Sequence, residues 1–247
     1  MIEIFHEDMV DTFATKAAYN TLYKEKGINQ RDSFYLWIIH LLNPDQGGVF
    51  LDISCGQGRL VNLAKAKGQR AIGMDFAIEG LVIGSKYPNC AAYNVADGEC
   101  LPLPSGSVDN ITHIGSLEHY MHPELGAKEI GRILKSSGKA AILLPNAFGL
   151  FGNIRYVLRY GDVFDDGQPV QRYATYQFWY KILKHGGLKV IQVKPYCEVD
   201  FPRAWNDFIW LIKRPQKIIR WLISFLIPLN LANHLVFICV PEQDKAE

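Results

Sequence analysis

The chain has 247 residues, of which 49% are hydrophobic, a length and composition typical of one globular α/β domain with insertions. Its 26 Lys and Arg residues nearly balance 25 Asp and Glu residues, so a net charge of +1 gives no support to nucleic-acid binding. The five cysteines form no CxxC pair, which argues against a metal site and against a disulfide framework, and favours a reducing compartment.

The amino terminus, MIEIFHEDMVDTF, carries acids where an export signal would carry basic residues followed by an apolar run. The most apolar late stretch, 218–227, is about half of the ~20 residues that a membrane-spanning helix needs, and it contains Arg220. We therefore expect a cytoplasmic protein without a transmembrane helix.

Short apolar segments with strand character alternate with segments of helical apolar spacing, which predicts an α/β sheet. The predicted strands are residues 49–53, 70–75, 90–95, 108–114, 139–145, 188–195 and 234–241. The predicted helices are residues 59–68, 76–87, 123–138 and 175–187. The first five strands are mostly apolar, as parallel strands buried on both faces should be. The sequence thus predicts a seven-stranded, mostly parallel sheet with helices on both faces.

Three segments lie outside a predicted cofactor-binding core at 46–145. Residues 1–45 are expected to form a helical cap, and residues 146–172 and 197–232 are insertions. Ligands of open α/β sheets bind beyond the carboxyl ends of the strands, where such insertions emerge. We therefore expect the insertions to select the substrate.

The most informative motif is VFLDISCGQGRLVNLA, an apolar strand that ends in Asp52, a turn with Gly56 and Gly58, and then a helix. Glycines allow a positive φ and a close approach of the backbone to a ligand, and the helix start offers free N–H groups to a carboxylate. Asp52 adds a negative charge for an ammonium group. A nicotinamide dinucleotide site uses a similar turn but prefers a small residue where Val61 stands.

With these flanks, the sequence resembles the class I S-adenosylmethionine-dependent methyltransferases, especially the methyltransferase-11-like group whose glycine motif reads LDxGCGxGR. The resemblance covers residues 46–145 and includes an LEH motif at 117–119. Ser54 stands in place of the first glycine, a departure that is tolerable if φ there is negative. The resemblance implies a Rossmann-like fold with an antiparallel last strand. It also implies S-adenosylmethionine as cofactor and S-adenosylhomocysteine as product.

The same resemblance assigns cofactor contacts residue by residue. The residues expected to bind the cofactor are Asp52, Ser54, Gly56, Gly58, Asp75, Phe76, Asp97, Gly98 and Ile114. Asp75 would accept the ribose hydroxyls, and Asp97 with Gly98 would hold the adenine. In the alternative reading the glycines only form a turn and the acids only cap helices, which leaves unexplained why three acids follow successive strands.

Methyl transfer from a sulfonium is an in-line displacement, so the protein must align the acceptor and, for a hydroxyl, remove a proton. Glu118, His119 and His122 follow the fourth strand near the expected methyl position and are the candidate bases, with His119 first. The alternative, in which Glu118 and His119 only orient loops and cap the next helix, stays open.

Two insertion segments carry features of binding surfaces. Residues 147–172 mix aromatic residues with Arg155, Arg159 and Arg172, which suit either a lid over an acidic acceptor or a solvated helix face. Residues 205–227 hold three of the five tryptophans. Their basic residues are Lys213, Arg214, Lys217 and Arg220. This combination is typical of an amphipathic element that touches a membrane, and equally of a core-facing cap or a homodimer face.

Together the residues and the resemblance predict an S-adenosylmethionine-dependent methyltransferase acting on a small-molecule, lipid or glycan intermediate, with oxygen as the expected methyl acceptor. Two alternatives stay open. One is a catalytically silent subunit that keeps the cofactor site, since Ser54 departs from the motif. The other is a nicotinamide-dependent oxidoreductase or epimerase, which Val61 disfavours.

Overall fold

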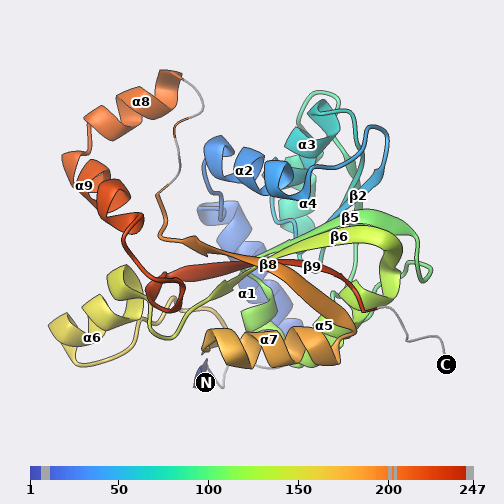
Figure 1. Ribbon diagram of the computed structural model, residues 1–247. Helices are drawn as coiled ribbons and strands as arrows, with labels where there is room; N and C mark the ends of the chain where they lie inside the picture. The colour runs from blue at the N-terminus through green and yellow to red at the C-terminus, as the bar shows by residue number, and fades with distance from the viewer. Residues whose placement is uncertain (7–11, 200–201, 203–204, 243–247) are drawn as a thin grey trace.

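The structure is a computed structural model that describes residues 1–6, 12–199, 202 and 205–242 (Figure 1). Seven strands form one sheet in the order β4-β3-β2-β5-β6-β9-β8. They are β2 (Val49–Ile53), β3 (Arg70–Asp75), β4 (Ala92–Val95), β5 (Val108–Ile114), β6 (Leu134–Pro145), β8 (Leu188–Tyr196) and β9 (His234–Pro241). Among these seven strands, β9 alone runs in the opposite direction, antiparallel to both of its neighbours, β6 and β8, and the other pairs are parallel. The predicted mostly parallel sheet with an antiparallel last strand is confirmed.

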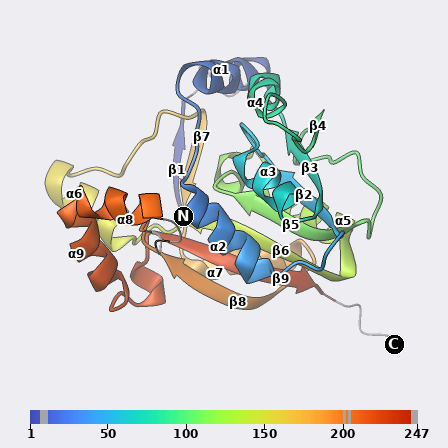
Figure 2. The ribbon, with the colours of Figure 1, turned by 90° about the horizontal axis from the view of Figure 1, so that it is seen from above.

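Helices cover both faces of the sheet (Figures 1 and 2). On one face, α2 (Asp32–Leu42) and α3 (Arg59–Ala66) share a buried apolar cluster with the strands, and α4 (Ile78–Gly84) follows β3. On the other face, α5 (Pro123–Ile133) and α7 (Tyr176–His185) share a second cluster. Trp179 of α7 is fully buried there, and its indole N–H donates to the Pro145 carbonyl at 2.8 Å. This bond ties α7 to the end of β6.

The predicted helix at 123–138 ends earlier than expected, at Ile133. Residues 134–138 instead extend β6, and Leu134 pairs with Val108 of β5 across an irregular register. Leu134 is buried, so the strand continues where an apolar side chain can still reach the core. The pairing of residues 134–138 with β5 therefore outweighs their local helical spacing.

Residues 1–45 are not helical throughout, in contrast to the expected helical cap. Strand β1 (Ile2–Phe5) precedes helices α1 (Thr12–Glu25) and α2. It pairs antiparallel with β7 (Val170–Tyr173) of the first insertion, in a separate two-stranded sheet (Figure 2). The sequence IEIF has the strand period of two, but its partner lies more than a hundred residues away. This ribbon brings the amino terminus beside the first insertion.

The two insertions hold short helices that lie together on one side of the molecule (Figures 1 and 2). The first contains η3 (Leu150–Ile154) and α6 (Arg155–Tyr160). The second contains α8 (Trp205–Ile212), α9 (Pro215–Ser224) and η4 (Leu229–Leu231). Within the described ranges, every helix is too short or too polar to cross a membrane.

Arg172 of β7 is buried inside the protein, so it is not the lid arginine that the sequence suggested. Its Nε donates to Oε1 of Glu3 at 2.6 Å. Its other guanidinium nitrogens donate to the backbone carbonyls of Glu118, Tyr120 and Met121. One side chain thus joins β1, β7 and the loop around η2 (Leu117–His119).

Replacing Arg172 by Met should lower the free energy of unfolding by about 3 kcal/mol, because Glu3 and three buried carbonyls would lose their donors. Urea denaturation measures this change. The control is Arg155→Met on α6, where the side chain is exposed and the change should stay within about 0.5 kcal/mol. Equal effects of the two substitutions would show that Arg172 does not hold the loop.

Candidate functional site

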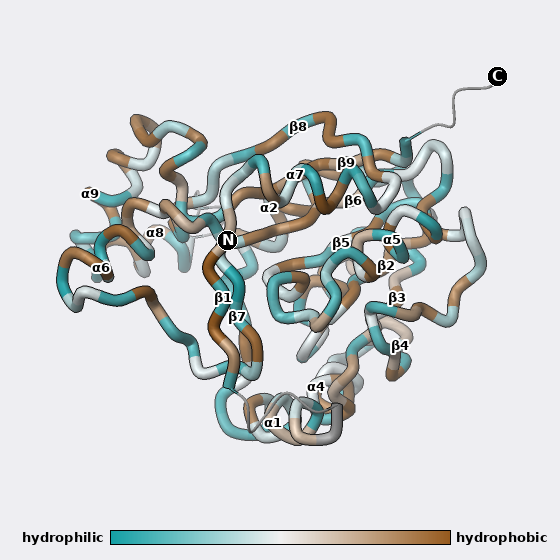
Figure 3. The backbone as a smooth tube through the Cα atoms, turned by 90° about the horizontal axis from the view of Figure 1, so that it is seen from below, coloured by the Kyte–Doolittle hydropathy of each residue, from teal (hydrophilic) through white to brown (hydrophobic). Residues whose placement is uncertain are grey.

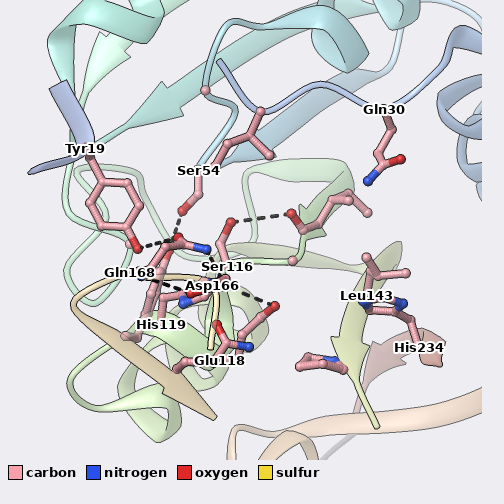
Figure 4. A pocket seen from close by; sticks show the side chains of 18 of the residues that line it. Tyr19, Gln30, Ser54, Ser116, Glu118, His119, Leu143, Asp166, Gln168 and His234 are labelled. Atoms are coloured by element: carbon pink, nitrogen blue, oxygen red, sulfur yellow. Dashed lines mark hydrogen bonds and ion pairs between the residues drawn. The ribbon is translucent and has the colours of Figure 1, made fainter. Parts of the chain in front are cut away.

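A cavity of about 790 Å³ opens at the carboxyl ends of β2, β3 and β5, beneath α1 and beside both insertions (Figure 4). The chain leaves β2 toward β3 on one side and returns to β5 on the other, so the cavity lies at the switch point of the sheet. Its volume is typical of ligand sites. Eight predicted cofactor residues line it: Asp52, Ser54, Gly56, Asp75, Phe76, Asp97, Gly98 and Ile114.

The remaining predicted residue, Gly58, lies just outside the cavity lining at the start of α3. Gly56 and Gly58 have φ values of 51° and 68°, in the left-handed region that favours glycine. A Cβ on Gly58 would collide with the hydroxyl of Tyr93, and one on Gly56 would lie 3.0 Å from the Tyr23 ring. The turn therefore needs both glycines for its shape and for the close packing around it.

Ser54 has a φ of 54°, so the negative φ that would have made serine an easy replacement for glycine is not found. Its Oγ lies 2.9 Å from the hydroxyl of Tyr120. That hydroxyl also lies 3.0 Å from Nε2 of His113, which is fully buried. A left-handed conformation costs a non-glycine residue about 1–2 kcal/mol. The hydrogen bond to Tyr120 offsets part of this cost.

Asp52 ends β2 and is buried, with Oδ1 accepting from Thr112 Oγ1 of β5 at 2.6 Å. Burial raises the pKa of Asp52 to about 7, although the Thr112 hydrogen bond acts in the opposite direction. Asp52 is therefore close to half ionised at neutral pH. A cation entering the cavity would favour the charged form of this carboxylate.

Asp75 ends β3 and is equally buried, but its carboxylate is already engaged with the backbone. Oδ2 accepts from the Gly56 N–H at 2.7 Å, and Oδ1 accepts from the Ala77 N–H at 2.8 Å. Burial raises its pKa, and these hydrogen bonds oppose the rise. The Tyr23 side chain and the Phe76 N–H also donate to Asp75, so its lone-pair sites, about four in a carboxylate, are in use, and a ribose hydroxyl would replace one of these donors. Asp75 thus shapes the glycine turn and can still bind a ribose.

Asp97 and Gly98 lie at the cavity rim after β4. Oδ1 of Asp97 accepts from the Glu99 N–H at 2.9 Å, which closes a small turn. Gly98 is covered by the Tyr120 ring, and a Cβ there would collide with the Tyr120 hydroxyl. The Tyr120 ring can lie this close to the backbone of Gly98 only because Gly98 lacks a side chain.

Glu118 and His119 both line the cavity and are both nearly inaccessible to solvent. Glu118 has a buried Oε2 without a hydrogen-bond partner among the described residues, and burial raises its pKa to about 8. Nδ1 of His119 lies 2.6 Å from the Val170 carbonyl, so it carries the proton and donates. Nε2 is then an acceptor, 3.8 Å from Oε1 of Glu118.

These environments assign different roles to the two side chains. Burial lowers the pKa of His119, so its imidazole is neutral and its Nε2 lone pair can take a proton. Glu118 is mostly protonated at neutral pH because its pKa is raised, and it suits hydrogen-bond donation better than proton abstraction. The geometry therefore favours His119 over Glu118 as a general base.

Comparisons with known proteins identify the domain that carries this site. Residues 51–142 match the methyltransferase domain family, Methyltransf_11. An S-adenosylmethionine-dependent methyltransferase from Mesorhizobium loti superposes with a TM-score of 0.62 at 15% identity, covering 84% of this chain and 97% of that one. The chain carries a class I methyltransferase domain. The cofactor of such domains is S-adenosylmethionine.

Two curated relatives match the methyltransferase domain in sequence. The ubiquinone/menaquinone biosynthesis C-methyltransferase UbiE of Geotalea uraniireducens is 27% identical over 56% of this chain and 61% of its own length. The 2-methyl-6-phytyl-1,4-hydroquinone methyltransferase of Spinacia oleracea is 25% identical over 71% of this chain and 51% of its own length. The chain thus spans about half to three fifths of the length of these relatives.

Several cavity residues of the methyltransferase domain were not expected from the sequence. On one wall, Tyr19 of α1 donates its hydroxyl to Gln168 of the first insertion at 2.9 Å. Figure 4 shows Asp166 and Gln168 beside His119, with His234 on the opposite side. The sequence carries a signal for the α1 residues, because Tyr19 and Tyr23 are spaced i and i+4 and so lie on one face of the helix. His122 lies exposed at the rim, and His185 at the end of α7 is not part of the cavity lining.

The opposite wall is formed by the second insertion and the start of β9. Glu198 has a positive φ of 58°, and its carboxylate accepts from Asn233 Nδ2 at 3.1 Å. Arg220 of α9 pairs with Glu198 at 3.1 Å and lies over the Phe151 ring at 4.7 Å. Nδ1 of His234 lies 3.8 Å from Glu198. Helix α9 is thereby joined to the wall of the cavity.

The left-handed conformation of Ser54 predicts an inverted order of stability for two substitutions. Ser54→Gly and Ser54→Ala both remove the hydroxyl, but only glycine relieves the positive φ. The glycine variant should be more stable by about 1 kcal/mol in urea denaturation.

The matched control is Ser85 at the end of α4, where φ is −68°. There the alanine variant should be the more stable one, because alanine has fewer conformations to lose on folding. An alanine preference at Ser54 as well would show that the residue is not held in the left-handed region.

Proposed function

We propose that this protein transfers a methyl group from S-adenosylmethionine to a hydroxyl group of a small-molecule or lipid acceptor. The single observation that carries the proposal is the juxtaposition, in one cavity, of the glycine turn with Asp52 and Asp75 and the neutral His119. S-adenosylmethionine supplies an electrophilic methyl group when it is bound. The protein supplies binding, orientation, exclusion of water and removal of a proton.

The residues present fit this cofactor. Asp52 is a desolvated carboxylate whose burial is offset by one hydrogen bond from Thr112, so an ammonium group would complete its environment. Gly56 and Asp75 both line the cavity, so the turn would face the methionine end, and the Asp75 carboxylate would accept the ribose hydroxyls in place of its bond from the Tyr23 side chain. The place for the adenine ring would be the backbone at Gly98, beside Asp97.

His119 is proposed as the general base. Its Nδ1–H is fixed on the Val170 carbonyl, so Nε2 can accept the proton of an acceptor hydroxyl bound in the cavity. Oε1 of Glu118 lies 3.8 Å from Nε2, and its carboxyl group, mostly protonated, would donate a hydrogen bond to the acceptor oxygen. The low exposure of both side chains keeps water from competing for the same proton.

The acceptor is inferred from the walls of the cavity. Leu143, Phe151, Tyr156 and Phe164 are among the residues that line the cavity, so it can hold an aromatic or aliphatic body. The names of the two curated relatives refer to a quinone pathway and to a phytyl-substituted hydroquinone. These observations support a hydroxylated aromatic acceptor with an apolar tail.

Carbon methylation is a second candidate, because the Geotalea relative is named a C-methyltransferase. Removal of a phenolic proton by His119 would make either the oxygen or a ring carbon more nucleophilic, so the same base suits both reactions. Mass spectrometry of the product with a deuterated methyl donor separates them. An aryl ether indicates oxygen transfer, and a ring-bound methyl group indicates carbon transfer.

Calorimetric titration with S-adenosylhomocysteine, with NAD as a control ligand, tests the cofactor assignment. Binding of the first and not the second supports the proposal. Binding of NAD alone would favour an oxidoreductase. Cofactor binding without transfer to any hydroquinone, phenol or polyprenyl acceptor would favour the silent subunit. If a folded protein bound neither ligand, the protein would have the methyltransferase fold but not the proposed function.

The pKa of Asp52 predicts that cofactor affinity depends on pH. The free carboxylate has a pKa of about 7, and an ammonium group binds its charged form. Affinity for S-adenosylhomocysteine should therefore be constant above pH ~7 and fall about tenfold per unit below it. Asp52→Asn should weaken binding at high pH and remove this dependence, measured by calorimetry from pH ~5.5 to ~8.5. The exposed Asp45→Asn should leave the profile unchanged.

The role of His119 predicts a separation of catalysis from binding. Asn in place of His119 can keep a donor to the Val170 carbonyl but lacks the Nε2 base. The transfer rate to a phytyl hydroquinone should fall by about 10²–10⁴-fold, with unchanged affinity for S-adenosylhomocysteine. His122→Asn at the exposed rim should change the rate by less than about threefold. A parallel loss of affinity in His119→Asn would instead indicate a structural LEH element.

A further inference from the structure

Helix α8 presents its apolar stripe to solvent. Trp205, Phe208, Ile209 and Ile212 follow the spacing i, i+3, i+4 and i+7, and their exposed fractions range from 39% to 77%. Of the eight described residues of this helix, only Leu211 is buried. A surface helix normally turns such a stripe toward the core. The orientation of α8 is therefore the reverse of that expected for a cap on this domain.

Helix α9 repeats the arrangement. Ile219, Leu222 and Ile223 of α9, with Leu226 in the turn that follows the helix, have the same spacing and are all exposed, Leu226 by 82%. Phe225 beside them is 68% exposed, and none of the ten described residues of α9 is buried. These exposures contradict the reading of residues 205–227 as a core-facing cap. Two consecutive helices thus leave a continuous run of large apolar side chains uncovered.

Helix α6 of the first insertion lies next to α9 in all three ribbon and tube views (Figures 1, 2 and 3). It adds Val157, Leu158 and Tyr160, of which Leu158 is 83% exposed. The contact between Arg220 and Phe151, just before α6, links the two insertions. We call the exposed apolar residues of α6 and α8, together with Ile219, Leu222, Ile223, Phe225 and Leu226, the helical face.

The charges carried by the helices of the helical face themselves are mostly positive. Residues 155–160 and 205–227 contain six basic residues and one acid, Asp207, which pairs with Arg31. The basic residues are Arg155, Arg159, Lys213, Arg214, Lys217 and Arg220. The whole chain has a net charge of only +1, so this concentration is local. Apolar side chains flanked by cations match the chemistry of an anionic phospholipid surface.

We propose that the helical face docks on an anionic lipid bilayer, with its apolar stripes at the boundary of headgroups and acyl chains. The basic residues other than Arg220, which pairs with Glu198, then lie among the phosphates. Because Arg220 joins α9 to Glu198 in the cavity wall, docking places the cavity beside the membrane. The docking surface rests on exposure and charge, so it is independent of the proposed methyl acceptor.

A second copy of the chain fits the helical face less well. A two-fold interface brings the same patch of both copies together, so the five basic residues other than Arg220 would face the same five of the second copy. Burial of unpaired like charges is strongly unfavourable. A bilayer rich in phosphatidylglycerol supplies the missing negative charge. The charge of the patch therefore favours lipid over a homodimer.

Sedimentation of the full chain with vesicles of equal parts phosphatidylglycerol and phosphatidylcholine tests the docking surface. We expect binding at low salt, weaker binding at high salt, and little binding to phosphatidylcholine alone. Leu158→Glu, Ile212→Glu and Leu226→Glu should each weaken binding about tenfold or more, because each removes an exposed apolar anchor. Ile191→Glu on β8, which is 51% exposed outside the helical face, should have no effect.

A charge pair of variants tests the electrostatic part. Lys213→Glu should weaken vesicle binding at least about fivefold, the factor that corresponds to about 1 kcal/mol per basic residue near an anionic surface. Lys189→Glu, exposed on β8, should not. A dimer that Leu226→Glu dissociates, without vesicle binding, would overturn the proposal, as would equal effects of face and control variants. Titration with S-adenosylhomocysteine in solution reports separately on the cofactor site.

Discussion

The hydrogen bond from the Gly56 N–H to the Asp75 carboxylate is the contact on which the site depends. This hydrogen bond joins the turn after β2 to the end of β3. The second oxygen of the Asp75 carboxylate accepts from the N–H of Ala77, the residue that precedes α4. The backbone of Gly56 is thereby fixed at a positive φ, and the first turn of α3 faces the cavity. A buried acid at this point is costly unless its oxygens are hydrogen-bonded. The same requirement that satisfies Asp75 also shapes the cofactor turn.

A second buried charge organises the acceptor side. Arg172 donates to three carbonyls around the LEH loop and to Glu3 of β1, so elements from the amino terminus and the first insertion hold Glu118 and His119 in place. The β1–β7 ribbon also carries Val170, whose carbonyl fixes the tautomer of His119. The proposed base is thus oriented by parts of the chain outside the cofactor-binding core.

The core of the fold could be predicted from the sequence because each central strand is a short apolar run bounded by turn residues. Strands 49–53, 70–75 and 108–114 have the predicted bounds, and Asp52 and Asp75, at the ends of the first two, line the cavity. Ser54 shows the limit of a motif, since its conformation depends on a hydrogen bond to Tyr120 that the sequence does not reveal. Serine is unfavourable at a positive φ, and the turn nevertheless holds Ser54 at a positive φ.

The insertions could not be placed from the sequence, because their positions depend on long-range contacts. The pairing of β1 with β7, the bond from Tyr19 to Gln168 and the ion pair between Arg220 and Glu198 each join segments that local periodicity treats separately. The amphipathic spacing of residues 205–227 was visible, but spacing alone does not say which way a stripe faces. The orientation becomes evident only from the exposure of Trp205 and Leu226.

That orientation connects the interior of the domain with its surface. Arg220 directs its guanidinium inward to Glu198 and Phe151, whereas Ile219 and Leu222 on the same helix face solvent. A bilayer that receives the outer stripes would therefore act on a helix that contacts two residues of the cavity wall, Glu198 and Phe151. Since Glu198 also holds Asn233 at the start of β9, a shift of α9 would be felt at the acceptor side of the cavity and not at the glycine turn. Surface attachment and acceptor entry are thus linked through one ion pair, while cofactor binding is left to the rigid ends of β2 and β3.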